Sequence, residues 1–142
     1  MIHGVDTSFL VAVEVSSHAE HARARARFQK LLKADDTFAL APQVLAEFIH
    51  IVTDPRRFSS PLDLSAAIER AEIWWNAAEV VHAFPTAEST LLFLGWLGEH
   101  QLGRKRLLDT MLASTLQASG VTSLLTLNRG DFRVFETFSF PK

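Results

Sequence analysis

The 142-residue sequence predicts a single α/β domain, residues 1–142, with a mainly parallel sheet between layers of helices. Short apolar segments alternate with longer stretches of helical periodicity along the whole chain, and this alternation is typical of parallel strands joined by helical crossovers. A content of 48% hydrophobic and 21% charged residues fits one globular core. No internal repeat or linker indicates a second domain.

The first half of the chain predicts two strands and two long helices. An apolar segment at 2–5 ends at polar residues and is expected to be the first strand. Serines that can cap a helix begin the stretch 16–32, and 38–40 is suited to a second strand. A proline at the first helical position predicts the next helix over 42–52, and the residues 56–62 are expected to form a loop.

The second half continues the alternation of helix and strand. A glycine just past a helical pattern is a common stop signal, and Gly98 and Gly120 occupy such positions. The expected elements are, in order, a helix over 63–76, a strand over 80–84, a helix over 85–97, a helix over 107–118, a strand over 123–126, a turn over 128–131 and a final strand over 138–140.

Composition excludes several kinds of protein. The chain has no cysteine, which rules out disulfides, thiol nucleophiles and cysteine-ligated zinc. No apolar run approaches the roughly 18 to 20 residues of a membrane span, and the first residues lack the features of a secretory signal, so a cytoplasmic protein without membrane association is expected. A formal net charge of -2 argues against binding nucleic acid through overall basicity and leaves local basic patches possible.

Acidic residues occupy the positions where a parallel sheet collects its ligands. Ligands bind outside the carboxyl ends of the strands, where Asp6 and the turn 128–131 are expected to emerge. Glu47 and Asp109 each place a carboxylate on an otherwise apolar helix face. With Asp131 in the turn, four acidic positions could converge on one site.

Such a cluster needs a counter-charge. Burial and mutual repulsion would raise the pKa values of the carboxyl groups, so an empty site would be costly. Oxygen ligands without cysteine suit Mg²⁺ or Mn²⁺, which favour hydrolysis of a phosphodiester by an activated water. Taken singly, each residue also fits an ordinary structural role, such as a helix cap at Asp6, an ion pair between Lys105 and Asp109, or a turn at 128–131.

Four segments, in this order and spacing, resemble the PIN domain, and specifically the VapC-type toxin ribonucleases of bacterial toxin-antitoxin pairs. The resemblance spans nearly the entire chain. The matching segments are Val5-Asp6-Thr7-Ser8-Phe9-Leu10, Val44-Leu45-Ala46-Glu47-Phe48, Leu108-Asp109-Thr110-Met111-Leu112-Ala113 and Leu125-Thr126-Leu127-Asn128-Arg129-Gly130-Asp131-Phe132.

The resemblance implies an α/β/α sandwich and a Mg²⁺- or Mn²⁺-dependent endoribonuclease that acts on structured RNA, either tRNA or rRNA. It also implies a VapB-type antitoxin as partner, and a homodimer. By the same analogy Asp6 and Asp109 are the principal metal ligands, and Glu47 holds a metal-bound water or takes part in coordination. Thr7 or Ser8 would brace the site through hydrogen bonds.

One position departs from the family pattern. Asn128 stands where many relatives carry Asp, and Asp131 could compensate for it. Because an amide brings no charge, one firmly bound ion is expected rather than two. The alternative function is a catalytically weakened PIN-like protein that binds RNA or serves in assembly.

Basic and aromatic residues complete the interpretation. Two basic groups flank the helices that carry Glu47 and Asp109 and are expected to guide the RNA, namely Arg56, Arg57, Arg104, Lys105 and Arg106. The basic residues between Arg23 and Lys33 could form either a solvated helix face or a phosphate track. The tryptophans are expected to pack in the core or against a partner.

Overall fold

A computed structural model describes all 142 residues and shows one four-stranded sheet. The strands are β1 (Ile2–Val5), β2 (Thr37–Leu40), β3 (Val80–His82) and β4 (Leu124–Leu125), in the order β3-β2-β1-β4. Every neighbouring pair is parallel. Because β1 lies between β2 and β4, the carboxyl ends of three strands meet at one edge, and the predicted α/β class is confirmed.

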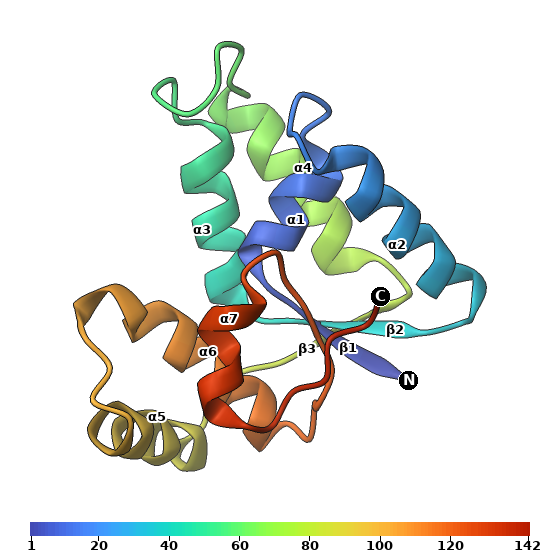
Figure 1. The fold of residues 1–142 in the computed structure, drawn as a ribbon. Coiled ribbons are helices and arrows are strands. Elements are labelled where there is room, and N and C mark those ends of the chain that lie inside the picture. Colours follow the sequence, from blue (N-terminus) through green and yellow to red (C-terminus); the bar gives the residue numbers. More distant parts are fainter.

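Helices cover both faces of this sheet. Figure 1 shows the first four helices on one side and α5 and α6 on the other, which makes a three-layered sandwich. The helices are α1 (Thr7–Glu14), α2 (His21–Lys33), α3 (Pro42–Val52), α4 (Leu64–Asn76), α5 (Ala87–Glu99), α6 (Leu107–Ala118) and α7 (Arg129–Phe132), with 3-10 turns at Arg104–Arg106 and Arg133–Phe135.

The first half differs from the prediction at α1 and at the start of α2. Helix α1 was not predicted, because six of its eight residues are buried and no polar face marks the helical period. The serines at 16 and 17 do not cap α2, which begins only at His21 with Glu20 at the N-cap position. The predicted helix over 42–52 is confirmed as α3.

The second half differs mainly at element ends. Thr86 and Ser89 form a capping box, so α5 begins at Ala87, and it continues through Gly98 to Glu99. Strand β3 stops at His82. The expected turn at 128–131 contains the short helix α7, and the expected strand at 138–140 is reduced to a single bridge between Ser123 and Ser139.

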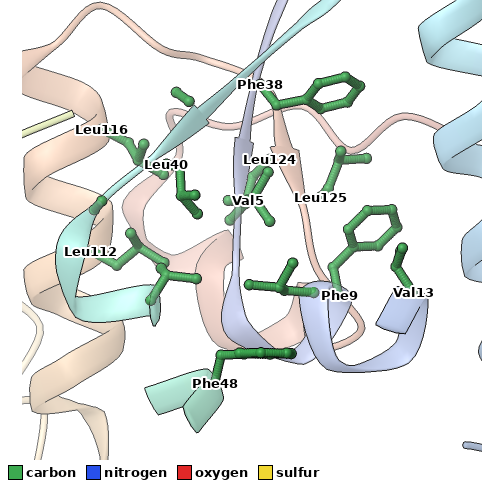
Figure 2. Close-up of a cluster of buried hydrophobic side chains, with 14 of the residues drawn as sticks. Val5, Phe9, Val13, Phe38, Leu40, Phe48, Leu112, Leu116, Leu124 and Leu125 are labelled. Carbon is green, nitrogen blue, oxygen red and sulfur yellow. The ribbon is translucent and has the colours of Figure 1, made fainter. Parts of the chain in front are cut away.

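The core lies on both faces of the sheet. Figure 2 shows side chains from strands and helices packed together, among them Val5 of β1, Phe48 of α3 and Leu116 of α6. Trp74 is buried, and its indole N–H donates to Glu14 at 2.6 Å. None of the helices is both long and apolar enough to cross a membrane.

Candidate active site

The site begins at the carboxyl ends of the two neighbouring strands β1 and β4. Asp6 follows β1 directly, and its backbone N–H donates to the carbonyl of Leu125 at 3.0 Å. Thr126 follows β4, so the parallel pairing brings its side chain beside Asp6. The hydroxyls of Ser8 and Thr126 both donate to Oδ2 of Asp6, each at 2.7 Å. Asp6 is thereby held in one orientation although only 5% of its surface is exposed.

Backbone groups orient these two hydroxyls in turn. The N–H of Leu127 donates to Oγ of Ser8 at 3.0 Å, and the N–H of Asn128 donates to Oγ1 of Thr126 at 2.9 Å. Since each hydroxyl accepts from the backbone, its proton is free to point at Asp6. Burial raises the pKa of Asp6, and the hydroxyl hydrogen bonds lower it in part.

Glu47 enters the site from α3. The hydroxyl of Thr7 donates to its Oε2 at 3.2 Å, and the amide of Gln43, one turn earlier, donates to its Oε1 at 3.2 Å. Burial raises the pKa of Glu47, the hydrogen bonds oppose that rise, and the charge of Asp6 adds to it. A half-buried carboxylate of this kind is a candidate proton acceptor.

Asp109 comes from the first turn of α6, where the helix dipole favours a negative charge. Burial, followed by repulsion from Asp6 and Asp131, raises the pKa of Asp109 to about 6. Arg106 lowers that pKa, but its Nε lies 4.0 Å from Oδ2 of Asp109, at the limit of an ion pair. Arg106 therefore compensates the charge of Asp109 only in part.

These side chains line one cleft of about 520 Å³. Its lining residues are Asp6, Thr7, Ser8, Val11, His18, Glu47, Ile51, Arg57, Phe58, Asp109 and Asn128. The structure thus brings together the sequence-predicted residues of four separate segments. Asp131 is the exception, because it lies on α7 outside the lining and acts on the cleft through its charge on Asp109.

The predicted RNA-guiding residues divide into two groups. Arg57 lines the cleft, whereas Arg56 is 93% exposed and lies outside it, and both lie near Asp54. Arg104 and Lys105 are exposed on the 3-10 turn that precedes α6, and only Arg106 of that turn reaches toward Asp109.

Three polar residues of the site, Gln43, Thr126 and His18, were not predicted from the sequence. Thr126 was only part of a matching segment, although a polar residue at the end of an apolar strand is a usable signal. His18 was not among the predicted site residues, but it lines the cleft from the connection between α1 and α2. Nothing in its local sequence pattern indicates that position.

The donor set fits a hard divalent cation. Three carboxylates face one cleft with raised pKa values, and a cation would relieve both burial and repulsion. No three imidazole or carboxylate side chains lie close enough to form a ready-made cage. Mg²⁺ is compatible with that arrangement, because it is usually held by one or two protein carboxylates together with waters and substrate phosphate.

Sequence comparisons identify relatives among ribonucleases. The chain is 32% identical to VapC ribonuclease Mb2897 of Mycobacterium bovis and, equally, to Ribonuclease VapC43 of Mycobacterium tuberculosis, over 83 residues in each case. Each match covers 58% of this chain and 52% of the relative, so it spans about half the length of these curated proteins.

Solved structures share the fold. VapC20 of Mycobacterium tuberculosis, described as a sarcin-ricin loop cleaving toxin, superposes with a TM-score of 0.74 at 22% identity over the whole of both chains. A chain of VapBC2 from Rickettsia felis superposes with a TM-score of 0.68 at 19% identity, covering 99% of this chain and 97% of that one. The PIN domain family matches residues 5–136, and the chain therefore belongs to the PIN domain family.

Proposed function

We propose that this chain is a metal-dependent endoribonuclease toxin of the VapC type, which hydrolyses phosphodiester bonds of structured RNA, either tRNA or rRNA. The observation that carries this proposal is the meeting of Asp6, Glu47 and Asp109, from three separate elements, in one cleft where burial and mutual repulsion raise the pKa of Asp109 to about 6. The ribonuclease names of the relatives support the same reaction class.

Asp6 and Asp109 would hold the Mg²⁺ or Mn²⁺ ion, with Asn128 offering an uncharged amide oxygen at the rim of the cleft. When bound, such an ion activates water and stabilises the charge that develops on the phosphate. The fixed orientation of Asp6 means that little reorganisation is needed at this position.

Glu47 is suited to orient the attacking water and accept its proton. Burial raises the pKa of Glu47 toward neutral pH, above that of an exposed glutamate, and a proton acceptor works best when its pKa lies near the working pH. The water oxygen forms a bond to phosphorus, its proton passes to Oε of Glu47, one ester P–O bond breaks, and the leaving ribose oxygen takes up a proton from solvent water. Thr7 and Gln43 hold this carboxylate in place throughout.

Incubation with total bacterial RNA tests this activity. The purified protein, free of any antitoxin, is incubated with Mg²⁺ or Mn²⁺ and in parallel with EDTA, and new RNA ends are mapped. Asp6→Asn should abolish cleavage and keep the fold, because an amide oxygen can accept the same two hydroxyl hydrogen bonds without the charge. Glu69→Gln, on an exposed surface of α4, serves as the matched control and should cleave normally.

The same experiment separates the enzyme from the alternative. A catalytically weakened RNA-binding or assembly protein would leave RNA intact in every lane and would bind RNA equally well with Asp6→Asn. Cleavage that persists in EDTA, or in the Asp6→Asn variant, would refute the metal-dependent mechanism.

We further propose a VapB-type antitoxin and a homodimer as the assembly states. The antitoxin proposal is supported by structural neighbours that are VapBC complexes from Rickettsia felis and Haemophilus influenzae. Large leucines stand exposed on α5 and at the start of α6, among them Leu91 at 72% and Leu108 at 57%, and burying them in a dimer would be favourable. Light scattering of the purified chain measures the dimer, and Leu91→Glu with Leu108→Glu should yield monomers.

A further inference from the structure

A second cavity, of about 400 Å³, lies beside the active-site cleft and is rich in arginine. Its lining residues are Glu20, Arg23, Ala24, Arg27, Thr126, Leu127 and Arg129. Three guanidinium groups face a single carboxylate there, and that carboxylate lies 3.5 Å from Arg23. The cavity therefore carries an excess of positive charge although the chain as a whole is slightly negative.

Arg27 is the arginine of this cavity whose guanidinium lacks a partner for a buried nitrogen. Its Nε is buried and has no hydrogen-bond partner. A buried donor without an acceptor destabilises the fold. Burial lowers the pKa of Arg27, and the charges of Arg129 and Arg23 lower it further. An anion in the cavity would satisfy the donor and relieve the repulsion at once.

Arg129 is already held in position before any ligand arrives. Its Nη2 donates to the carbonyl of Pro141 at 3.2 Å, and its guanidinium carbon lies 6.0 Å from the centre of the Phe140 ring. A side chain that is fixed in this way loses little conformational entropy on binding. Arg27 and Arg129 come from different elements, so the cavity is built by the tertiary fold and not by one helix face.

The cavity is joined to the active site by a shared wall. Thr126 lines the cavity and also donates to Asp6, while Asn128, two residues later, lines the catalytic cleft. The segment 126–129 therefore contributes neighbouring residues to both the arginine-rich cavity and the active-site cleft. The arginine cavity is therefore a candidate site for a second phosphate of an RNA strand bound at the carboxylates.

We propose that Arg23, Arg27 and Arg129 form a phosphate subsite that binds an RNA backbone phosphate next to the one that is cleaved. The planar guanidinium group matches phosphate oxygens with two parallel hydrogen bonds, which makes arginine suited to this ligand. This inference rests on the proposed ribonuclease function, since it takes RNA as the substrate.

Binding of RNA without metal tests the subsite separately from catalysis. A fluorescein-labelled single-stranded RNA dodecamer of mixed sequence is titrated in EDTA at several salt concentrations, and its integrity is checked on a gel. The logarithm of the binding constant falls linearly with the logarithm of the salt concentration. Loss of one phosphate contact lowers the magnitude of this negative slope by about 0.7 for a single strand. Arg27→Gln and Arg23→Gln should each show that decrease with a several-fold weaker affinity, and Arg27→Lys should keep the slope.

Arg25→Gln is the matched control, because this arginine is exposed on the same helix and does not line the cavity. Its slope should equal that of the wild type, and thermal melts confirm that each variant is folded. Equal slopes in all variants, or no binding of RNA by the wild type, would overturn the subsite. In the first case an acidic protein segment becomes the better occupant. Cleavage with equal slopes refutes the subsite alone, whereas a lowered slope without cleavage refutes the nuclease alone.

Discussion

Replacing Asp109 by asparagine should stabilise the metal-free protein while it abolishes activity. Burial and the charges of Asp6 and Asp131 raise the pKa of Asp109 from 3.8 to about 6. At 1.36 kcal/mol per pKa unit, this shift corresponds to about 3 kcal/mol of destabilisation once the carboxyl is ionised. The side chain is 29% exposed, so solvent screening reduces the expected gain to about 1–2 kcal/mol.

The sign of the pH dependence follows from proton binding. The folded protein holds the proton of Asp109 more tightly than the unfolded chain, so the free energy of unfolding falls as pH rises from 3.8 toward 6. Above that window the full penalty is present. The Asp109→Asn variant carries no such penalty, and the difference between the two proteins should shrink to about a third at pH 4.5.

Thermal melts in EDTA at pH 7.5 and pH 4.5 measure this effect. We expect Asp109→Asn to raise the Tm by about 3–8 °C at pH 7.5 and by clearly less at pH 4.5. Glu99→Gln, a change at an exposed carboxylate of α5, should leave the Tm unchanged at both pH values. A variant that is less stable than the wild type at pH 7.5, or a gain that is equal at both pH values, would refute the account of Asp109 as a strained carboxylate.

Three further outcomes are expected. Mn²⁺ at one hundred times its Kd should stabilise the wild type by about 2.7 kcal/mol in a thermal melt and leave Asp6→Asn unaffected; equal stabilisation would place the ion elsewhere. Thr126→Val leaves the N–H of Asn128 without its acceptor and Asp6 without one donor. This variant should lower the free energy of unfolding by about 1–3 kcal/mol in urea titrations, whereas Thr126→Ser, which keeps the hydroxyl, should not. Gly4→Ala would place a Cβ 2.6 Å from Cδ1 of Leu116, and it should lower the free energy of unfolding by about 1–3 kcal/mol in the same assay. An unchanged urea midpoint would show that the Leu116 side chain moves aside freely.

Helices with one apolar and one polar face could be predicted from the sequence. Helix α3 was placed correctly from its proline and from the apolar face that contains Val44 and Phe48. Helix α1 was missed because Phe9, Leu10 and Val11 are buried on all sides, and periodicity is absent where every face meets the core. Local pattern therefore identifies amphipathic elements and fails for an element enclosed by the fold.

The site was predicted as far as its carboxylates. Asp6 stood out at the end of an apolar strand, and Glu47 and Asp109 stood out because acidic residues are rare on apolar helix faces. Asp131 illustrates the limit, since a four-residue helix turns it away from the lining and no turn signal distinguishes that helix from a simple bend. The sequence left a phosphate track open for the basic residues between Arg23 and Lys33, but no pattern joins them to Arg129 of α7, which completes the arginine cavity.

The position of β1 in the middle of the sheet also governs when activity can arise during synthesis. The partners of Asp6 include Thr126, which is 120 positions further along the chain. A ribosome therefore translates nearly all of the domain before β4 can pair with β1. Asp6 lacks its neighbour Asp109 until α6 has been made, and it lacks its donor Thr126 until β4 has been made. Contacts so distant in sequence form late and slowly. Under the proposed function, the cleft can cleave RNA only after this late pairing has completed it.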